Sequence, residues 1–134
     1  MRILRSFVAT AAVAGALLGA TAPAQAATTT SWRIEYGASV TAGTISWTDG
    51  RSASVSGNVH AVSAYRETCV WGVNGGTTTD IACYGANPGK DHPFYHGLTI
   101  DKVGGVQLIH ISFYDAYNHK LGQRACTRNG CVAE

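Results

Sequence analysis

The side chains with most chemical capacity in this sequence are its histidines and its scattered acids. His92 and His96 stand four residues apart, the spacing that places two imidazoles on one face of a helix for metal binding. Pro93 and Gly97 oppose a helix there, and no glutamate lies between the two histidines. The segment is therefore predicted to hold surface histidines and no metal.

His110 lies between Ile109 and Ile111 on an expected strand, and a general base is the functional alternative for this residue. Strand alternation instead sends it to the outer face of a sheet, and His60 and His119 are expected on outer faces or in turns. No serine lies in a Gly-x-Ser-x-Gly elbow, and the acids show no pairing typical of glycoside hydrolysis. We predict no catalytic residue, no cofactor and no enzyme activity.

Composition narrows the class of protein. The chain has 134 residues, of which 46% are hydrophobic and 13% charged, and its formal net charge is +2. This length is typical of one domain, and the apolar fraction excludes a disordered chain. With so few charged residues and a net charge of only +2, the chain is not expected to bind nucleic acid through its phosphates.

The first 26 residues have the pattern of a secretory signal peptide. Arg2 and Arg5 precede an apolar stretch that is too short to span a bilayer, and Ala24-Gln25-Ala26 offers small residues at the cleavage positions. Removal of the two arginines leaves eight basic residues against eight acidic ones, so the mature domain is neutral. We expect a secreted, extracellular protein with no membrane anchor.

Four cysteines in an exported chain predict two disulfides. A hairpin centred on Gly76 places Cys69 directly opposite Cys83, close enough to bridge. Closure of that loop is worth about 3 kcal/mol in the chain-entropy model. Cys126 and Cys131 then close a shorter loop through an Asn-Gly turn, worth about 2 kcal/mol on the same model. Zinc is the alternative for four cysteines, but it favours closer spacing.

The remaining chain, residues 32–134, reads as one all-β domain. Apolar and polar residues alternate from Trp32 to Tyr36 and from Val106 to Phe113, and Asp49-Gly50 lies between two alternating runs as a hairpin signal. Residues 51–61 read as one long strand broken at Gly57. We predict an immunoglobulin-like antiparallel β-sandwich of about seven strands.

Two segments depart from this pattern. Residues Ala27, Thr28, Thr29, Thr30 and Ser31 form a small polar leader with nothing to bury, which predicts a flexible segment. Gly85 to Gly97 contains two prolines and several glycines and is predicted to be a surface loop. That loop carries Phe94 and Tyr95, either as recognition residues or, for Phe94, as a plug of the open end of the sandwich.

The pattern of residues 43–57, the run Phe113-Tyr-Asp-Ala-Tyr-Asn118 and the closing Cys126-x4-Cys131 resemble small secreted β-sandwich proteins of actinobacteria. Within that group the chain resembles the connector subunit of secreted umbrella toxin particles. A weaker likeness, carried by the Cys126-x4-Cys131 loop alone, is to the enediyne-binding apoproteins.

The connector resemblance implies a non-catalytic adaptor that joins other secreted proteins in an antibacterial assembly. The leader from Ala27 to Ser31 would insert into one partner, and Phe94 and Tyr95 would anchor the other. One alternative is a carbohydrate or small-molecule binder with a pocket lined by Trp71, Phe94 and Tyr95. The other is a protease inhibitor that presents Arg128 within the Cys126–Cys131 loop.

Overall fold

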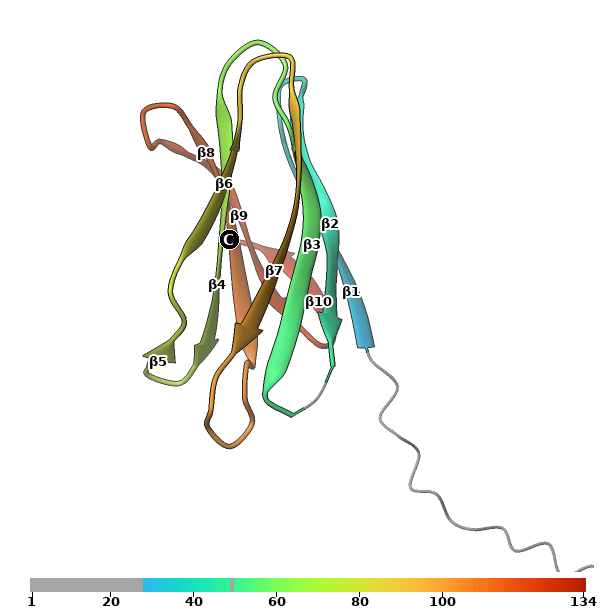
Figure 1. Ribbon diagram of the computed structural model, residues 1–134, viewed down its shortest axis with the longest axis vertical. Coiled ribbons are helices and arrows are strands. Elements are labelled where there is room, and N and C mark those ends of the chain that lie inside the picture. Colours follow the sequence, from blue (N-terminus) through green and yellow to red (C-terminus); the bar gives the residue numbers. More distant parts are fainter. Residues whose placement is uncertain (1–27, 49) are drawn as a thin grey trace, which may run out of the picture.

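The protein, described by a computed structural model over residues 28–48 and 50–134, is built from strands (Figure 1). Its strands are β1 (Thr28–Tyr36), β2 (Ser39–Trp47), β3 (Ser52–His60), β4 (Arg66–Asn74), β5 (Thr77–Thr78), β6 (Ala82–Ala86), β7 (Asp91–Thr99), β8 (Leu108–Asp115), β9 (Lys120–Thr127) and β10 (Gly130–Ala133). The all-β class is confirmed, whereas the expected number of about seven strands is wrong. The predicted signal peptide and Ala27 lie outside the described residues.

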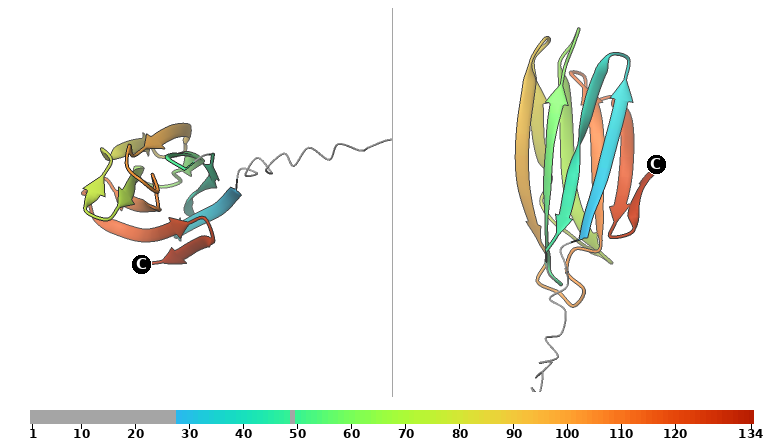
Figure 2. Two further views of the ribbon diagram at one scale, coloured as in Figure 1. Left: turned by 90° about the horizontal axis from the view of Figure 1, so that it is seen from below. Right: turned by 90° about the vertical axis from the view of Figure 1, so that its right-hand side faces the viewer.

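The strands form two antiparallel sheets that face each other. The first has the order β1-β2-β3-β7, and the second has the order β10-β9-β8-β4-β5, with β6 also paired to β4. Viewed along the strands, the two sheets enclose one interior (Figure 2). A β-sandwich with two disulfides is therefore the architecture, and its immunoglobulin-like topology stays a prediction.

Alternating side chains build the core between the sheets. Ile109, Ile111 and Phe113 of β8 are fully buried, and His110 between them lies on the outer face, as predicted. Trp32 and Ile34 of β1 are buried against the same cluster. The period-2 pattern of the sequence therefore identified which face of these strands packs inward.

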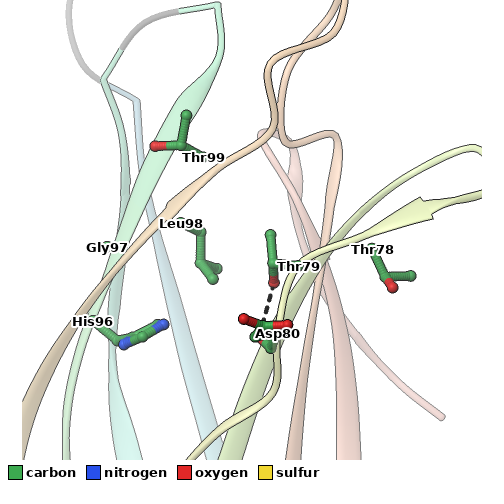
Figure 3. Close-up of a pocket in the computed structure, with 7 residues that line it drawn as sticks. All are labelled: Thr78, Thr79, Asp80, His96, Gly97, Leu98 and Thr99. Atoms are coloured by element: carbon green, nitrogen blue, oxygen red, sulfur yellow. Dashed lines mark hydrogen bonds between the residues drawn. The ribbon is translucent and has the colours of Figure 1, made fainter.

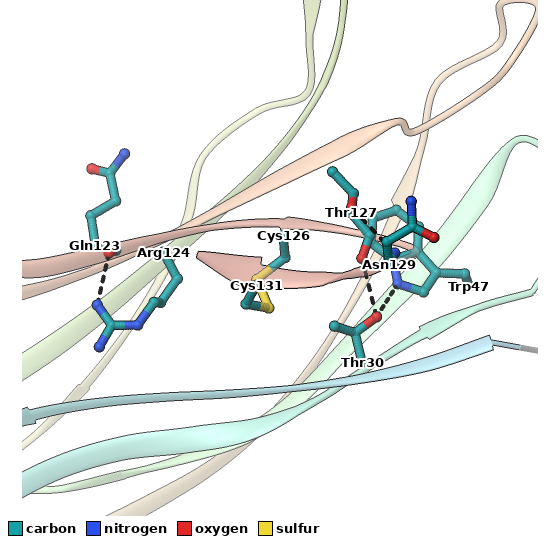
Figure 4. Close-up of a disulfide and its surroundings, with 8 residues drawn as sticks. All are labelled: Thr30, Trp47, Gln123, Arg124, Cys126, Thr127, Asn129 and Cys131. Carbon is teal, nitrogen blue, oxygen red and sulfur yellow. Dashed lines mark hydrogen bonds between the residues drawn. A yellow bond between two sulfur atoms is a disulfide. The ribbon is translucent and has the colours of Figure 1, made fainter. Parts of the chain in front are cut away.

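The predicted flexible leader is wrong for Thr28 to Ser31, which form the first residues of β1 and pair with β2. The Trp47 Nε1–H donates to Thr30 Oγ1 at 2.9 Å, and the Thr30 hydroxyl donates to the Thr127 carbonyl at 3.2 Å (Figure 4). Thr30 continues the inward phase of Trp32, but a threonine does not register as apolar. A buried hydrogen bond, and not hydrophobicity, fixes this end of the strand.

The predicted surface loop from Gly85 to Gly97 is also wrong. The chain leaves β6 at Ala86, turns through Gly89 with a φ of 75°, and runs as β7 from Asp91 onward. Proline is tolerated in a strand when its missing N–H faces away from the neighbouring strand. Pro93 meets this condition because β7 is an edge strand with β3 on one side.

Both predicted disulfides are confirmed, Cys69–Cys83 and Cys126–Cys131. Cys69 and Cys83 are direct cross-strand partners of β4 and β6, as the hairpin register required. One detail differs, because Val73 pairs with Thr78 and so the tip of the hairpin is offset by one residue. A bulge between Thr78 and Ala82 restores the register and divides one expected strand into β5 and β6.

Candidate functional site

A cleft of about 450 Å³ opens where the edge strand β7 of one sheet faces the β5–β6 segment of the other. Its lining residues are Thr78, Thr79, Asp80, His96, Gly97, Leu98 and Thr99 (Figure 3). His96 and Leu98 extend from β7 toward Thr79 and Asp80 on the opposite wall. The bulge that divides β5 from β6 supplies that wall.

The backbone of β7 presents unpaired groups along this side. At one end of the strand the Ala61 N–H donates to the Lys90 carbonyl at 3.1 Å, and at the other the Ile100 N–H donates to the Arg51 carbonyl at 3.2 Å. Even-numbered residues of β7 therefore bond toward β3, because hydrogen-bonded pairs recur at every second residue of an unbroken antiparallel ladder. The N–H and C=O groups of Tyr95, Gly97 and Thr99 point the other way. Within residues 28–48 and 50–134 they have no backbone partner on that side.

The other sheet edges are shorter or covered. On the far side of the sandwich β1 packs against β9 and β10, and Thr30 bonds to Thr127 across that gap. The edge strands β1 and β7 each have nine residues, whereas β6 has five, β10 has four and β5 has two. Because β1 is covered by β9 and β10, the longest open edge of the described chain is the one beside the cleft.

An aromatic cluster closes the space between β6 and β7 next to the cleft. The Tyr84 ring stacks on Phe94 with centroids 4.6 Å apart, and the Tyr84 hydroxyl lies 2.8 Å from His96 Nδ1. This cluster fixes one wall, because the His96 imidazole belongs to both the cluster and the cleft. Burial and stacking of Phe94 hold the two edges together there and leave them apart at Thr78–Asp80.

Thr79 stabilises the opposite wall. Its Oγ1 accepts a hydrogen bond from the Gly72 N–H at 2.9 Å and donates to the Asp80 carbonyl at 3.1 Å. The Asp80 side chain remains exposed to the cleft. The two hydrogen bonds of the Thr79 hydroxyl hold the segment between β5 and β6 in a defined conformation, although this segment is not itself a strand.

The residues predicted to bind a partner are not brought together. Phe94 is 7% exposed and belongs to the core, whereas Tyr95 is 69% exposed on the outer face of β7. Thr28, Thr29 and Ser31 are exposed on β1, the opposite edge of the same sheet from β7. Of the two expectations for Phe94, the one that has it fill the sandwich agrees with its burial, and its role as a recognition residue does not.

The predicted small-molecule pocket of Trp71, Phe94 and Tyr95 is wrong. Trp71 stacks on His110 with centroids 5.1 Å apart, on the outer face of the second sheet. Phe94 is inside and Tyr95 is outside the first sheet, since neighbouring residues of a strand point to opposite faces. The three rings share no cavity.

Two histidines near the end of β7 that is remote from the cleft are held by hydrogen bonds. His92 Nδ1 lies 2.6 Å from the Gly85 carbonyl, and His60 Nδ1 lies 2.7 Å from the Asp91 carboxylate. Hydrogen bonds from Asn58 and then from His60 hold the pKa of the Asp91 carboxyl below its usual value.

One group of three residues that could bind a metal ion occurs in the described chain, Glu67 with Cys69 and Cys83. The two sulfur atoms of this group form a disulfide with each other.

Asp115 lies at the turn between β8 and β9, and its carboxyl makes the stability of the folded chain depend on pH. Burial raises the pKa of its carboxyl, but hydrogen bonds from the N–H groups of His119 and Tyr117 outweigh burial and leave the pKa lowered. A carboxyl whose pKa is lowered by folding stabilises the folded state at any pH above its ordinary, unfolded pKa. This stabilisation is lost as the pH falls through the pKa of the folded state.

We therefore expect Asp115→Asn to lose less stability than the parent chain between about pH 7 and pH 3, where carboxyls of ordinary pKa become protonated. The amide oxygen still accepts the two N–H bonds, so the substitution removes the charge together with the contact of Oδ2 with His119 Nδ1 at 3.1 Å. Urea unfolding at the two pH values measures the difference. Parallel losses in both proteins would contradict this role of the carboxylate.

Arg128 lies in the hairpin between β9 and β10, close to the second disulfide. Its guanidinium carbon is 5.4 Å from the centroid of the Trp47 ring. Because Gly130 pairs with Thr127, the segment is a tight two-residue turn. A protease inhibitor would need an extended loop with a free side chain at this position.

The cleft was not identified from sequence. In the sequence Asp80 is one of several scattered acids, and Gly97 is the last residue of the predicted loop. Their juxtaposition depends on the β4–β6 and β3–β7 pairings, which join segments with no local signal for each other. The one usable sign was Pro93, which marks an edge strand when its surroundings alternate.

No helix in the described part of the chain is long and apolar enough to cross a membrane. The chain matches no protein-family model, no curated protein and no solved structure.

Proposed function

We propose that the protein is a secreted, non-catalytic binding module that takes an extended segment of another secreted protein as an additional strand along β7. The observation that carries this proposal is the row of unpaired backbone groups at Tyr95, Gly97 and Thr99 beside the cleft. Added strands bind through main-chain hydrogen bonds, and pockets along the edge read alternate side chains.

The half of β7 that borders the cleft lacks the protection that edge strands commonly have. Proline and inward-pointing charges block edge pairing in many sheets. Pro93 removes a donor from the first half of β7, whereas Tyr95, Gly97 and Thr99 keep theirs. Each main-chain hydrogen bond contributes about 0.5–1.5 kcal/mol net, so a short row suffices for micromolar binding only with side-chain contacts in the cleft.

An adaptor in an extracellular antibacterial assembly is the role that we propose for this binding. The two disulfides are consistent with an extracellular location. The resemblance to small secreted sandwich connectors supports the same role, and an immunoglobulin-like fold forms part of that proposal. Because Thr28 to Ser31 belong to β1, the docking segment is supplied by the partner and received by this chain.

A carbohydrate in the same cleft is less well supported. Sugar rings are commonly held by stacking on aromatic faces, and among the residues that line the cleft only His96 has a ring. The neighbouring Tyr84 ring is already stacked on Phe94.

Gly97→Pro is expected to weaken the binding of an added strand by about tenfold or more. Proline removes the outward N–H of residue 97, and the loss of one net hydrogen bond with added steric conflict corresponds to that factor. The ladder to β3 does not use this N–H, and Pro93 already occupies the same phase of the strand. The probe is a linear dodecapeptide selected on the parent domain from a random phage-displayed library, with affinity measured by calorimetry.

Gly97→Ala is the matched control. Because a Cβ at Gly97 meets nothing within 4 Å, alanine keeps the N–H and the fold and should leave the affinity nearly unchanged. Hydrogen exchange should show that the peptide protects the amides of Tyr95, Gly97 and Thr99. Equal binding by the proline variant, or protection confined to other strands, would overturn strand addition at β7.

A further inference from the structure

Asp80 differs from every other acidic residue in the described part of the chain because its carboxylate has no partner. The other acids in residues 28–48 and 50–134 are each bonded to a neighbour: Glu35 to Arg33, Glu67 to Tyr65, Asp91 to His60, Asp101 to Arg51, Asp115 to His119 and Glu134 to His110. Acids on this small neutral domain are thus satisfied as a rule, and the exception lies in the cleft wall.

The cleft directs particular side chains of an added strand toward Asp80. His96 and Leu98 project from the inner face of β7 toward the β5–β6 segment (Figure 3). A strand that pairs with the outer edge of β7 shares the pleat of that sheet, so its alternate side chains project in the same direction. One of them therefore enters the cleft opposite Asp80.

The chemistry of the lining selects what that side chain is. Leu98 is the apolar residue of the lining, and Asp80 is its one charged residue. The Thr99 hydroxyl lies on the outer face of β7, where it is 2.9 Å from Ser52 Oγ, and it does not take part in this selection. An aliphatic stem that ends in a cation fits this set, because the stem packs on Leu98 while the charge meets a carboxylate. No lysine or arginine lines the cleft to neutralise Asp80 from within the chain.

We infer that the cleft is a specificity pocket for a lysine or arginine of the docked strand, with Asp80 as its counter-ion. This inference rests on the proposed function, since the β7 edge must first align the segment. It commits to a basic peptide as the occupant.

The test is the composition of peptides selected from the random dodecapeptide library on three immobilised proteins: the parent chain, Asp80→Asn and Asp80→Lys. On the parent we expect lysine and arginine at one fixed position, enriched about threefold or more over the starting library. The asparagine variant should lose this enrichment, and the lysine variant should favour aspartate or glutamate at the same position. Asp80 is exposed and its backbone lies in a bulge, so these substitutions should preserve the fold, which urea unfolding checks.

A selected basic peptide and its glutamate-substituted copy then give the size of the effect. We expect Asp80→Asn to weaken the basic peptide by about two- to fivefold, the range of exposed ion pairs, and to strengthen the glutamate copy, because the substitution removes the repulsion between two carboxylates. The difference should shrink at high salt.

The two proposals fail in different ways. If selected peptides protect the β7 amides but carry no charge preference that responds to Asp80, strand addition stands and the basic pocket is wrong. If no selected peptide depends on the outward N–H of Gly97, both proposals are wrong. Charge selection that survives Asp80→Asn would also overturn the role of this carboxylate.

Discussion

Replacement of Gly43 by alanine should lower the free energy of unfolding by more than about 3 kcal/mol, the upper range for overpacking a core. Gly43 of β2 pairs with Gly57 of β3. A Cβ at Gly43 would lie 1.9 Å from the Ser56 carbonyl oxygen and 2.6 Å from the Gly57 Cα. Both are backbone atoms of the paired strand, so relief requires the strands to separate.

Two other glycines calibrate this result. At Gly57 a Cβ would meet the Trp32 ring at 2.6 Å, the Ala42 carbonyl oxygen at 2.9 Å and the Phe94 ring at 3.0 Å. The nearest of these atoms belongs to a side chain, which can shift partly, whereas at Gly43 all three nearest atoms belong to the backbone. Gly57→Ala should therefore destabilise, but by less than Gly43→Ala. Gly97→Ala meets nothing and should change stability by less than about 0.5 kcal/mol, as surface substitutions do.

Urea unfolding followed by tryptophan fluorescence measures all three variants. A Gly43→Ala protein that cannot be refolded agrees with the expectation, provided that Gly97→Ala folds normally. A midpoint for Gly43→Ala within error of the parent would show that the two strands are farther apart at this pair than the structure has them.

The paired glycines also show what the sequence conveyed and what it did not. The alternation around Gly57 predicted a strand on each side of it, and the expected break at Gly57 is absent because β3 is continuous from Ser52 to His60. Glycine there serves a close approach to β2 and to the Trp32 ring. A glycine in a strand marks either a break or a close approach, and local sequence does not distinguish them.

Strands with apolar alternation were predicted well, and strands without it were missed. The runs ending at Tyr36 and Phe113 were found because half of their residues bury hydrocarbon. Thr30 and the first half of β7 were assigned to irregular segments because a buried threonine and a strand proline contradict the simple pattern. Their strand conformation depends on partners far away in sequence, Trp47 and β3.

The candidate site was hidden for the same reason. Asp80 and Gly97 are 17 positions apart in the printed chain. Gly97 belongs to β7 of the first sheet, and Asp80 belongs to the segment that joins β5 and β6 of the second. The disulfide register placed Cys83 correctly, but the bulge at Asp80 arises from the offset between two parts of one hairpin. The offset between these two registers depends on how the side chains of the hairpin pack. The prediction from the spacing of the cysteines along the chain contains no information on that packing.

Trp47→Ala is the second substitution with a large expected effect, a loss of about 3–5 kcal/mol, typical of a large aromatic residue removed from a core. Trp47 is 1% exposed and donates its Nε1–H to Thr30 at 2.9 Å. The Arg128 guanidinium carbon lies 5.4 Å from the ring centroid. Three segments, β1, β2 and the β9–β10 hairpin, therefore meet at Trp47, and Figure 4 shows Thr30, Thr127 and Asn129 beside it.

Thr30→Val and Trp71→Ala separate the causes of that loss. Valine keeps the shape of threonine but leaves the Trp47 N–H without its acceptor, which should cost about 1–3 kcal/mol. Trp71 is the same residue type on an outer face, where it is partly exposed, so its removal should cost less than that of Trp47. Equal effects at Trp47 and Trp71 would contradict the burial that distinguishes them.

The Thr30→Val protein also tests how the two sides of the sandwich differ. The hydrogen bonds at Thr30 close the β1 side against Thr127, which leaves β7 as the long open edge. The two edges of the first sheet are separated by β2 and β3, so weakening one should not alter the other. We expect Thr30→Val to raise hydrogen exchange of β1 amides while the affinity for a β7-binding peptide stays within about twofold. New peptide-dependent protection on β1 in this variant would show that the threonine guards that edge against pairing, which is the role that Pro93 has on the first half of β7.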